Sequence, residues 1–290
     1  MDILNAHDIV LTGIPRGGTT LACQLLGTAA DTLALFEPMP VHELPLQHES
    51  ALAEVVDYFG RVRQQALSLG RVPSKQRAGK VPDNPYGDRD DAVGVRPWLA
   101  GLGEIAVDKP LSPSFRLVIK HNSAFVALLP ALATRYPVIG VLRNPLAVLA
   151  SWRSVDLSVS HGCLPAGERL DPALAAALAA QPDLLRRQVL LVDWFFDRLQ
   201  KWVSPARLIR YEDTVIEGGA GLLQAAGVAV TTAAPAHLRS RNLNPQYAAD
   251  EVATLVAALR EHATACWHSY PLEEVQALAA GMCRGLVGDA

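Results

Sequence analysis

Short apolar runs alternate along this chain with longer segments whose apolar positions recur at helical spacing. An apolar run of roughly four to eight residues between turn signals predicts a buried strand, and recurrence at about every third or fourth position predicts a helix. The expected strands are 8–13, 33–36, 116–120, 138–142 and 207–210. The expected helices lie near 18–29, 50–69, 124–135, 145–154, 171–180, 183–202, 219–227 and 248–266. Such alternation predicts an α/β fold, a central parallel β-sheet flanked by helices on both faces.

The stretch 9–27, IVLTGIPRGGTTLACQLLG, joins an expected strand to an expected helix through a glycine turn. At such a junction the free N–H groups of the helix start and the positive end of its dipole form an anion site. From Gly13 to Thr20 the spacing G-x-x-x-x-G-x-T is that of a P-loop, but Thr19 occupies the position of its lysine. The nearest basic residue is Arg16. The loop therefore suits a nucleotide with a shorter anionic tail, unless it is an ordinary strand–turn–helix corner.

A second candidate anion site follows the expected strand 138–142, in the sequence VIGVLRNPLAVLASWR. Arg143 marks the carboxyl end of the strand, and Pro145 suits the first turn of a helix. Ser151 lies eight residues after Arg143, about two helical turns along, so both can face the same edge of the sheet. Together they could hold a second phosphate, although alone they would be a solvated arginine and a surface serine.

The segments PRGGTTL and LRNPLAVLAS resemble the two cofactor signatures of the sulfotransferases that use 3′-phosphoadenosine 5′-phosphosulfate (PAPS). LIRYEDT at 208–214 resembles the tyrosine-containing segment of the same family. The resemblance implies a P-loop-like, bacterial-type sulfotransferase fold and PAPS as the cofactor. It assigns Arg16, Gly17, Gly18, Thr19 and Thr20 to the 5′-phosphosulfate, Arg143 and Ser151 to the 3′-phosphate, and Tyr211 to the adenine. By position and charge, Arg239 or Arg241 in 237–247 could also contact the 3′-phosphate.

Two residues compete for the role of catalytic base. Glu37 follows the expected strand 33–36 in TLALFEPMP, where several members of the family have a glutamate that deprotonates the acceptor hydroxyl. Burial beside apolar neighbours should raise its pKa toward a useful range. His121 is the rival, one position out of step with the histidine of the cytosolic branch; it could also assist Glu37 or contact the acceptor. Lys120 and Arg16 are expected to stabilise the transition state.

The 290 residues, half of them hydrophobic, suffice for one large core, so a single domain over 1–290 is expected. Within it, 71–98 is rich in charge, proline and glycine and has no periodicity. Such a long loop is either a lid or acceptor-binding segment or a disordered surface insertion.

A net charge of −3 argues against nucleic acid as a partner, and four scattered cysteines predict neither a zinc site nor disulfides. No leader and no run of about 18 apolar residues is visible, so a cytoplasmic protein without a membrane span is expected. The partners would be a nucleotide cosubstrate and a hydroxyl acceptor such as a sugar, a glycolipid or a small metabolite. The alternatives are a P-loop kinase or nucleoside triphosphatase, weakened by the absent lysine, and a non-catalytic nucleotide-binding protein of the same fold.

Overall fold

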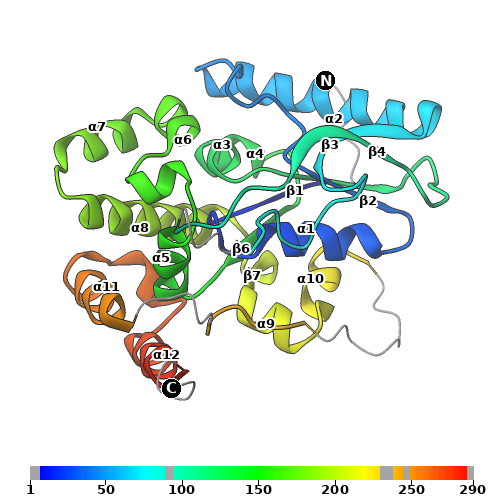
Figure 1. Cartoon of the computed structure of the whole chain (residues 1–290). Coiled ribbons are helices and arrows are strands. Elements are labelled where there is room, and N and C mark those ends of the chain that lie inside the picture. The colour runs from blue at the N-terminus through cyan, green and yellow to red at the C-terminus, as the bar shows by residue number, and fades with distance from the viewer. Residues whose placement is uncertain (1–6, 89–93, 229–237, 244–248, 286–290) are drawn as a thin grey trace.

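The computed structural model describes residues 7–88, 94–228, 238–243 and 249–285. At its centre, five parallel strands form one sheet in the order β2-β5-β1-β6-β7 (Figure 1). The strands are β1 Asp8–Gly13, β2 Thr32–Phe36, β5 Arg116–Lys120, β6 Val138–Leu142 and β7 Leu208–Arg210. β1, β5 and β6 have the expected bounds, and β2 and β7 differ by one residue at their start. The expected α/β class with a central parallel sheet is confirmed.

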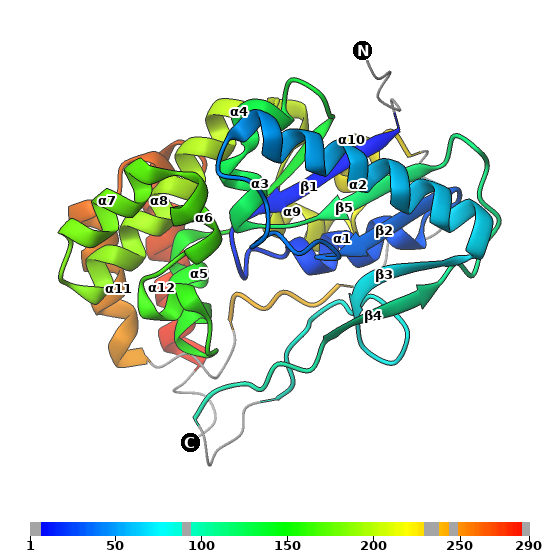
Figure 2. The same cartoon turned by 90° about the horizontal axis from the view of Figure 1, so that it is seen from above.

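Helices cover both faces of this sheet (Figure 1 and Figure 2). The α-helices are α1 Thr19–Thr28, α2 His48–Leu69, α3 Ser123–Ala127, α4 Leu129–Leu132, α5 Pro145–Arg153, α6 Pro165–Leu170, α7 Pro172–Ala180, α8 Leu184–Trp202, α9 Tyr211–Ile216, α10 Ala220–Ala225, α11 Ala249–His262 and α12 Leu272–Gly285. Three short 3₁₀ segments are η1 Ser158–His161, η2 Pro205–Arg207 and η3 Ala265–His268. No helix within the described ranges is long and apolar enough to cross a membrane.

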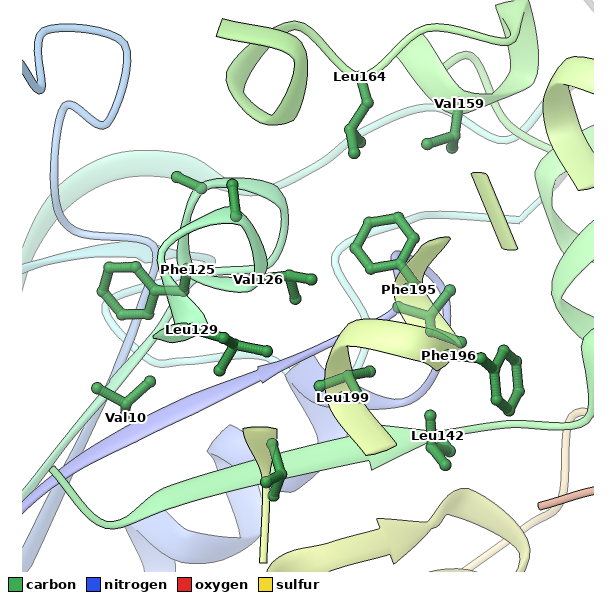
Figure 3. Packing of buried hydrophobic residues seen from close by; sticks show 14 of the residues in the cluster. Val10, Phe125, Val126, Leu129, Leu142, Val159, Leu164, Phe195, Phe196 and Leu199 are labelled. Carbon is green, nitrogen blue, oxygen red and sulfur yellow. The ribbon is translucent and has the colours of Figure 1, made fainter. Parts of the chain in front are cut away.

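The sheet is buried on both faces because neighbouring residues of a strand point to opposite sides. Val10 packs in the core that α2, α3 and α8 cover, whereas Ile9 and Leu11 pack in the core beside α1 and α10. Figure 3 shows part of the first core, where Leu129 and Leu199 from two helices lie over the strands. Strands buried on both faces are continuous apolar runs, which is why the sequence located them well.

The expected helix 124–135 is two short helices, α3 and α4, with a break before Pro130. Proline has no N–H, so the carbonyl of Val126 loses the partner that it would have in a continuous helix. Arg198 of α8 replaces that partner: its Nε donates to the carbonyl of Val126 at 2.9 Å, and its Nη2 donates to that of Ala127 at 2.6 Å. A tertiary contact thus stabilises the break.

The second half of the chain also differs from the expected elements, which did not include α6, α9 or α12. The expected helix 248–266 ends earlier, because α11 stops at His262. Beyond it, the Asp193 carboxylate of α8 accepts hydrogen bonds from the backbone N–H groups of Thr264 and Ala265 at 2.9 and 2.8 Å. These bonds hold the chain in the turn that leads to η3.

The segment 71–98 was expected to lack regular structure, and this is wrong for its first six residues. They form β3 Arg71–Gln76, which pairs antiparallel with β4 Gly101–Ala106 along the β2 side of the molecule (Figure 2). The strand escapes prediction because Pro73 and polar side chains interrupt its apolar pattern. Its buried Ser74 accepts a hydrogen bond at 3.0 Å from the N–H of Phe36, which fixes the hairpin beside the end of β2. Residues 89–93 of this segment lie outside the described residues.

Candidate functional site

A cavity of about 800 Å³ lies at the carboxyl ends of the parallel strands, where open α/β sheets bind their ligands. Its walls come from the loop between β1 and α1, the ends of β2, β5 and β6, strand β3, and the segments around η1 and α6. The sequence-predicted residues that line it are Arg16, Gly18, Thr19, Thr20, Glu37, Lys120, His121, Arg143, Tyr211, Arg239 and Arg241. Two other predicted residues, Gly17 and Ser151, are not part of its lining.

The loop between β1 and α1 presents the start of a helix to this cavity. Gly18 is the N-cap of α1 with a φ of 96°, and no described side chain caps the helix. A Cβ on Gly18 would lie 2.5 Å from Cδ2 of Tyr211, so this position requires glycine both for its conformation and for space. The turn is closed by the N–H of Gly17, which donates to the carbonyl of Ile14 at 2.8 Å. The first N–H groups of α1 can therefore bind an anion.

Arg16 extends from the same turn and connects the loop to two other segments. Its Nε donates to the hydroxyl of Ser151 at 3.1 Å, and its Nη1 donates to Oδ1 of Asn84 at 3.4 Å. Its guanidinium lies over the ring of Tyr86, 4.4 Å from the centroid. Both Arg16 (φ 68°) and Glu37 (φ 45°) have a left-handed backbone. This conformation costs energy in residues with a side chain, and it clusters at functional sites.

The Glu37 carboxylate lies between two lysines. Its Oε1 is 2.6 Å from Nζ of Lys120, and its Oε2 is 2.6 Å from Nζ of Lys75. Lys120, at the end of β5, is only 2% exposed, and its ammonium lies 4.6 Å from the centroid of the Phe36 ring. Burial lowers the pKa of Lys120, and the Glu37 charge opposes that shift. The three side chains form a compact charged cluster, two cations around one anion.

The expected rise in the pKa of Glu37 is wrong. Burial does raise the pKa, but the charges of Lys120 and Lys75 outweigh it and lower the pKa to about 2. The expectation considered burial alone. It left out the charge of Lys120, and Lys75 belongs to β3, which the sequence did not reveal as a strand next to Glu37. The carboxylate is therefore ionised in this structure.

His121 lies beside this cluster, but the backbone holds its ring. Its Nε2 accepts a hydrogen bond at 3.1 Å from the N–H of Met39, and the ring packs against Phe125 with centroids 5.0 Å apart. Burial, opposed by the Glu37 charge, lowers the pKa of His121 to about 3. The imidazole is therefore neutral, and the lone pair of Nε2 is already engaged.

Arg143 lies at the end of β6, as expected, and its guanidinium ties three chain segments together. Its Nη1 donates to the carbonyl of Arg16, its Nη2 to the carbonyl of Arg241 and its Nε to Oδ1 of Asn242, each at 2.8 Å. These bonds use three of the five N–H groups of an arginine. Ser151, which was expected to share an anion with Arg143, is buried and bonds to Arg16. Arg143 and Ser151 of the second motif therefore stabilise the loop between β1 and α1 through Arg16.

Tyr211, the first residue of α9, packs between the glycine loop and Arg143. Its ring centroid lies 4.8 Å from the Arg143 guanidinium, and its hydroxyl accepts a hydrogen bond at 2.9 Å from the N–H of Arg241. The neighbouring Glu212 accepts from the N–H of Asn144 at 3.1 Å and from Nδ2 of Asn242 at 2.8 Å. The residues Tyr211 and Glu212 therefore connect β6 to residues 241–242. Within the expected basic segment 237–247, residues 237 and 244–247 lie outside the described residues.

Sequence reasoning missed several cavity residues. The most important of them is Lys75, because it binds the Glu37 carboxylate. Asn84, Tyr86 and Trp98 also line the cavity. All four belong to 71–98, which the composition singled out as a unit. No motif distinguishes these residues within it, because their positions depend on the hairpin and on the bridge between Tyr86 and Trp98.

Comparison with protein-family models and with curated proteins gives no match for this chain. Among solved structures, it is similar to the sulfotransferase STF1 from Mycobacterium tuberculosis, with 16% sequence identity and a TM-score of 0.34. The similarity covers 94% of this chain and 76% of that one.

Proposed function

We propose that this protein is a sulfotransferase that moves the sulfuryl group of PAPS to an acceptor hydroxyl and releases adenosine 3′,5′-bisphosphate. The observation that carries the proposal is the Glu37 carboxylate, held between Lys120 and Lys75 in the cavity that also receives the uncapped start of α1. A hydroxyl needs a base to become a good nucleophile, and a transferred sulfuryl group needs cations around it. Both requirements meet in this cavity.

The described residues fit a nucleotide with anionic groups at two places. On the 5′ side, Arg16 and the first N–H groups of α1 would bind the phosphosulfate. On the 3′ side, Arg143 retains two N–H groups beyond its three hydrogen bonds to described residues, and Arg239 lines the same cavity. Tyr211 would contact the adenine. Bound PAPS would supply the sulfuryl group, whose bond to the phosphate oxygen breaks as the acceptor oxygen bonds to sulfur.

Glu37 would receive the proton of the acceptor hydroxyl. With a pKa of about 2 it is a weak base as long as both lysines bind it. We infer that Lys120 leaves the carboxylate to neutralise the charge that grows on the phosphate oxygen. The loss of one cation raises the pKa of Glu37 at the moment when it must accept a proton. Lys75 keeps the other carboxylate oxygen in position. His121, whose Nε2 is bound to the Met39 N–H, orients the chain after Glu37.

The kinase alternative has less support. A nucleoside triphosphatase needs a cationic side chain in the loop at the position of Thr19 and an aspartate for Mg²⁺ at the end of an apolar strand. The candidate for that aspartate is Asp213, after β7, and it is not part of the cavity lining. A non-catalytic nucleotide-binding protein would have no need for a carboxylate between two lysines.

Calorimetric titration with adenosine 3′,5′-bisphosphate, and separately with ATP and Mg²⁺, tests the proposal. We expect micromolar binding of the bisphosphate, about −8 kcal/mol, without a metal requirement and with much weaker binding of ATP. Tight binding of ATP–Mg²⁺ without preference for a 3′-phosphate would favour the kinase class. Sulfate transfer from PAPS, followed by mass spectrometry, separates an enzyme from a non-catalytic binding protein.

A further inference from the structure

Part of the cavity is lined by apolar side chains that the proposed nucleotide contacts leave unused. This apolar wall consists of Phe36, Val41, Tyr86, Trp98, Val159 and Leu164. It combines the end of β2 and the loop after it, the two bridged positions 86 and 98, η1 and the residue that caps α6. None of these residues belongs to either phosphate motif, so the wall forms a separate surface for a second ligand.

Trp98 contacts the other two aromatic rings of the apolar wall next to the Glu37 cluster. The Trp98 ring meets Tyr86 edge-on with centroids 5.1 Å apart, and it lies 6.0 Å from Phe36. Phe36 directly precedes Glu37, and Nζ of Lys75 lies 5.2 Å from the centroid of Trp98. The rings therefore border the carboxylate that would take the acceptor proton. Trp98 is 41% exposed, although it faces a cavity with its aromatic partners around it.

Aliphatic side chains continue the wall from η1 and α6. Val159 and Leu164 are each only 2% exposed, yet both line the cavity. In Figure 3 they lie above Phe125 and Val126 of α3, which belong to the same hydrophobic cluster. The carbonyl of Val41 accepts a hydrogen bond at 3.3 Å from Nη2 of Arg169, which ties the loop after β2 to α6. The aliphatic wall is thus fixed by packing and by a hydrogen bond.

The described residues of the apolar wall carry no charge. The neighbouring cavity residues include two carboxylates, Asp83 and Asp156, and Asp83 pairs with Arg241 at 3.5 Å. The cations of the cavity belong to the glycine loop, the Glu37 cluster, the end of β6 and the segment with Arg239 and Arg241. In the proposed complex these cations bind the nucleotide or Glu37, so the wall offers a polyanionic sugar chain no cationic partner.

The hydroxyl of Tyr86 is a polar group that a ligand can satisfy. The Tyr86 side chain is 4% exposed, and its oxygen is buried without a hydrogen-bond partner among the described residues. Burial raises the pKa of Tyr86 to about 12, so the group keeps its proton. The charges of Arg16, Glu37, Arg96 and Asp156 all act on this hydroxyl. The Tyr86 side chain is part of the cavity lining. A buried O–H without an acceptor destabilises the protein, and a hydrogen bond to a ligand oxygen would remove that cost.

On the basis of the proposed function, we propose that the acceptor is an uncharged alcohol on an apolar body that packs against the apolar wall. Trp98 contacts this body, and Tyr86 acts as a specificity residue whose hydroxyl donates to an oxygen of the acceptor. The shared chemistry is an aliphatic or aromatic alcohol, and the wall itself offers no cation to a sulfated or carboxylated sugar.

Titration with 1-octanol and 2-naphthol, compared with methyl glucoside and a sulfated disaccharide, tests the acceptor class. The protein is titrated with and without saturating adenosine 3′,5′-bisphosphate. We expect both apolar alcohols to bind at least about tenfold more tightly than methyl glucoside, since only they bury surface on the wall. Tighter binding of either sugar overturns the proposal. Absence of nucleotide binding while the alcohols still bind overturns the proposed function alone.

Two variants locate the binding surface. Trp98→Ala should weaken binding of 1-octanol about tenfold and change bisphosphate affinity less than about twofold. Trp202→Ala is the matched control, because Trp202 is similarly exposed (37%) but lies on α8 outside the cavity. Tyr86→Phe keeps the ring and should weaken binding of 2-naphthol about threefold to tenfold, through the lost hydrogen bond. Equal effects of Trp98→Ala and Trp202→Ala would exclude the wall as the acceptor site.

Discussion

Replacement of Glu37 by glutamine would leave two lysines next to each other without the carboxylate that neutralises them. The buried Lys120 determines the cost, because its side chain is 2% exposed, whereas that of Lys75 is 34% exposed. Loss of one partner of a buried ion pair costs about 3–5 kcal/mol, since the remaining charge stays out of water. A partly exposed pair contributes only about 0–1 kcal/mol. Glu37→Gln should therefore lower the free energy of unfolding at pH 7 by about 3 kcal/mol.

Urea unfolding followed by circular dichroism measures this effect in four proteins: the wild type, Glu37→Gln, Lys120→Met and the double variant. The double variant has no buried unpaired charge, because only the partly exposed Lys75 remains, so it should recover most of the stability that Glu37→Gln loses. Wild-type stability should also depend on pH in a defined window. Because the folded pKa of Glu37 is lowered from 4.5 to about 2, its contribution is present above pH 4.5 and is lost as the pH falls toward 2.

Two results would refute this reasoning. A loss below about 1 kcal/mol for Glu37→Gln would mean that solvent screens the pair as it screens surface ion pairs. A double variant no more stable than Glu37→Gln would mean that Lys120 is not the stranded charge. Transfer activity gives a separate test, because Glu37→Gln should lower it by about 10²- to 10⁴-fold while bisphosphate binding remains.

Three further predictions concern the rest of the site. His121→Gln keeps an acceptor for the Met39 N–H, so sulfate-transfer activity should stay within about tenfold of wild type. A loss as large as that of Glu37→Gln would transfer the role of base to His121. Gly18→Ala should destabilise the fold by about 1–3 kcal/mol in thermal unfolding, since the new Cβ would meet the Tyr211 ring. The control is Gly60→Ala in α2, which has open space around it and should be neutral or stabilising. Arg143→Ala should weaken binding of adenosine 3′,5′-bisphosphate more than binding of adenosine 5′-phosphate, and equal losses in calorimetry would argue against the 3′-phosphate contact.

The sequence identified the elements whose signals are local. Apolar runs located the five strands of the central sheet, and paired glycines marked the turn before α1. The two-stranded hairpin was not predicted, because its first strand carries Pro73 and polar residues and its partner strand lies about 30 residues later, which leaves no local pattern. The split between α3 and α4 was not predicted either, because Arg198 of a distant helix provides the hydrogen bonds that make the break favourable.

By itself, the sequence determined that Arg16, Glu37, Lys120 and Arg143 follow strand ends, so a parallel fold had to bring them to one edge. Only the tertiary structure decided which of these groups bind one another. Lys120 and Lys75, which are 83 and 38 residues away from Glu37, both bind its carboxylate, and their charges together reverse the expected direction of the pKa shift. The physical reason is that strand and turn signals act between neighbours in sequence, whereas a pKa depends on the nearest charges in space.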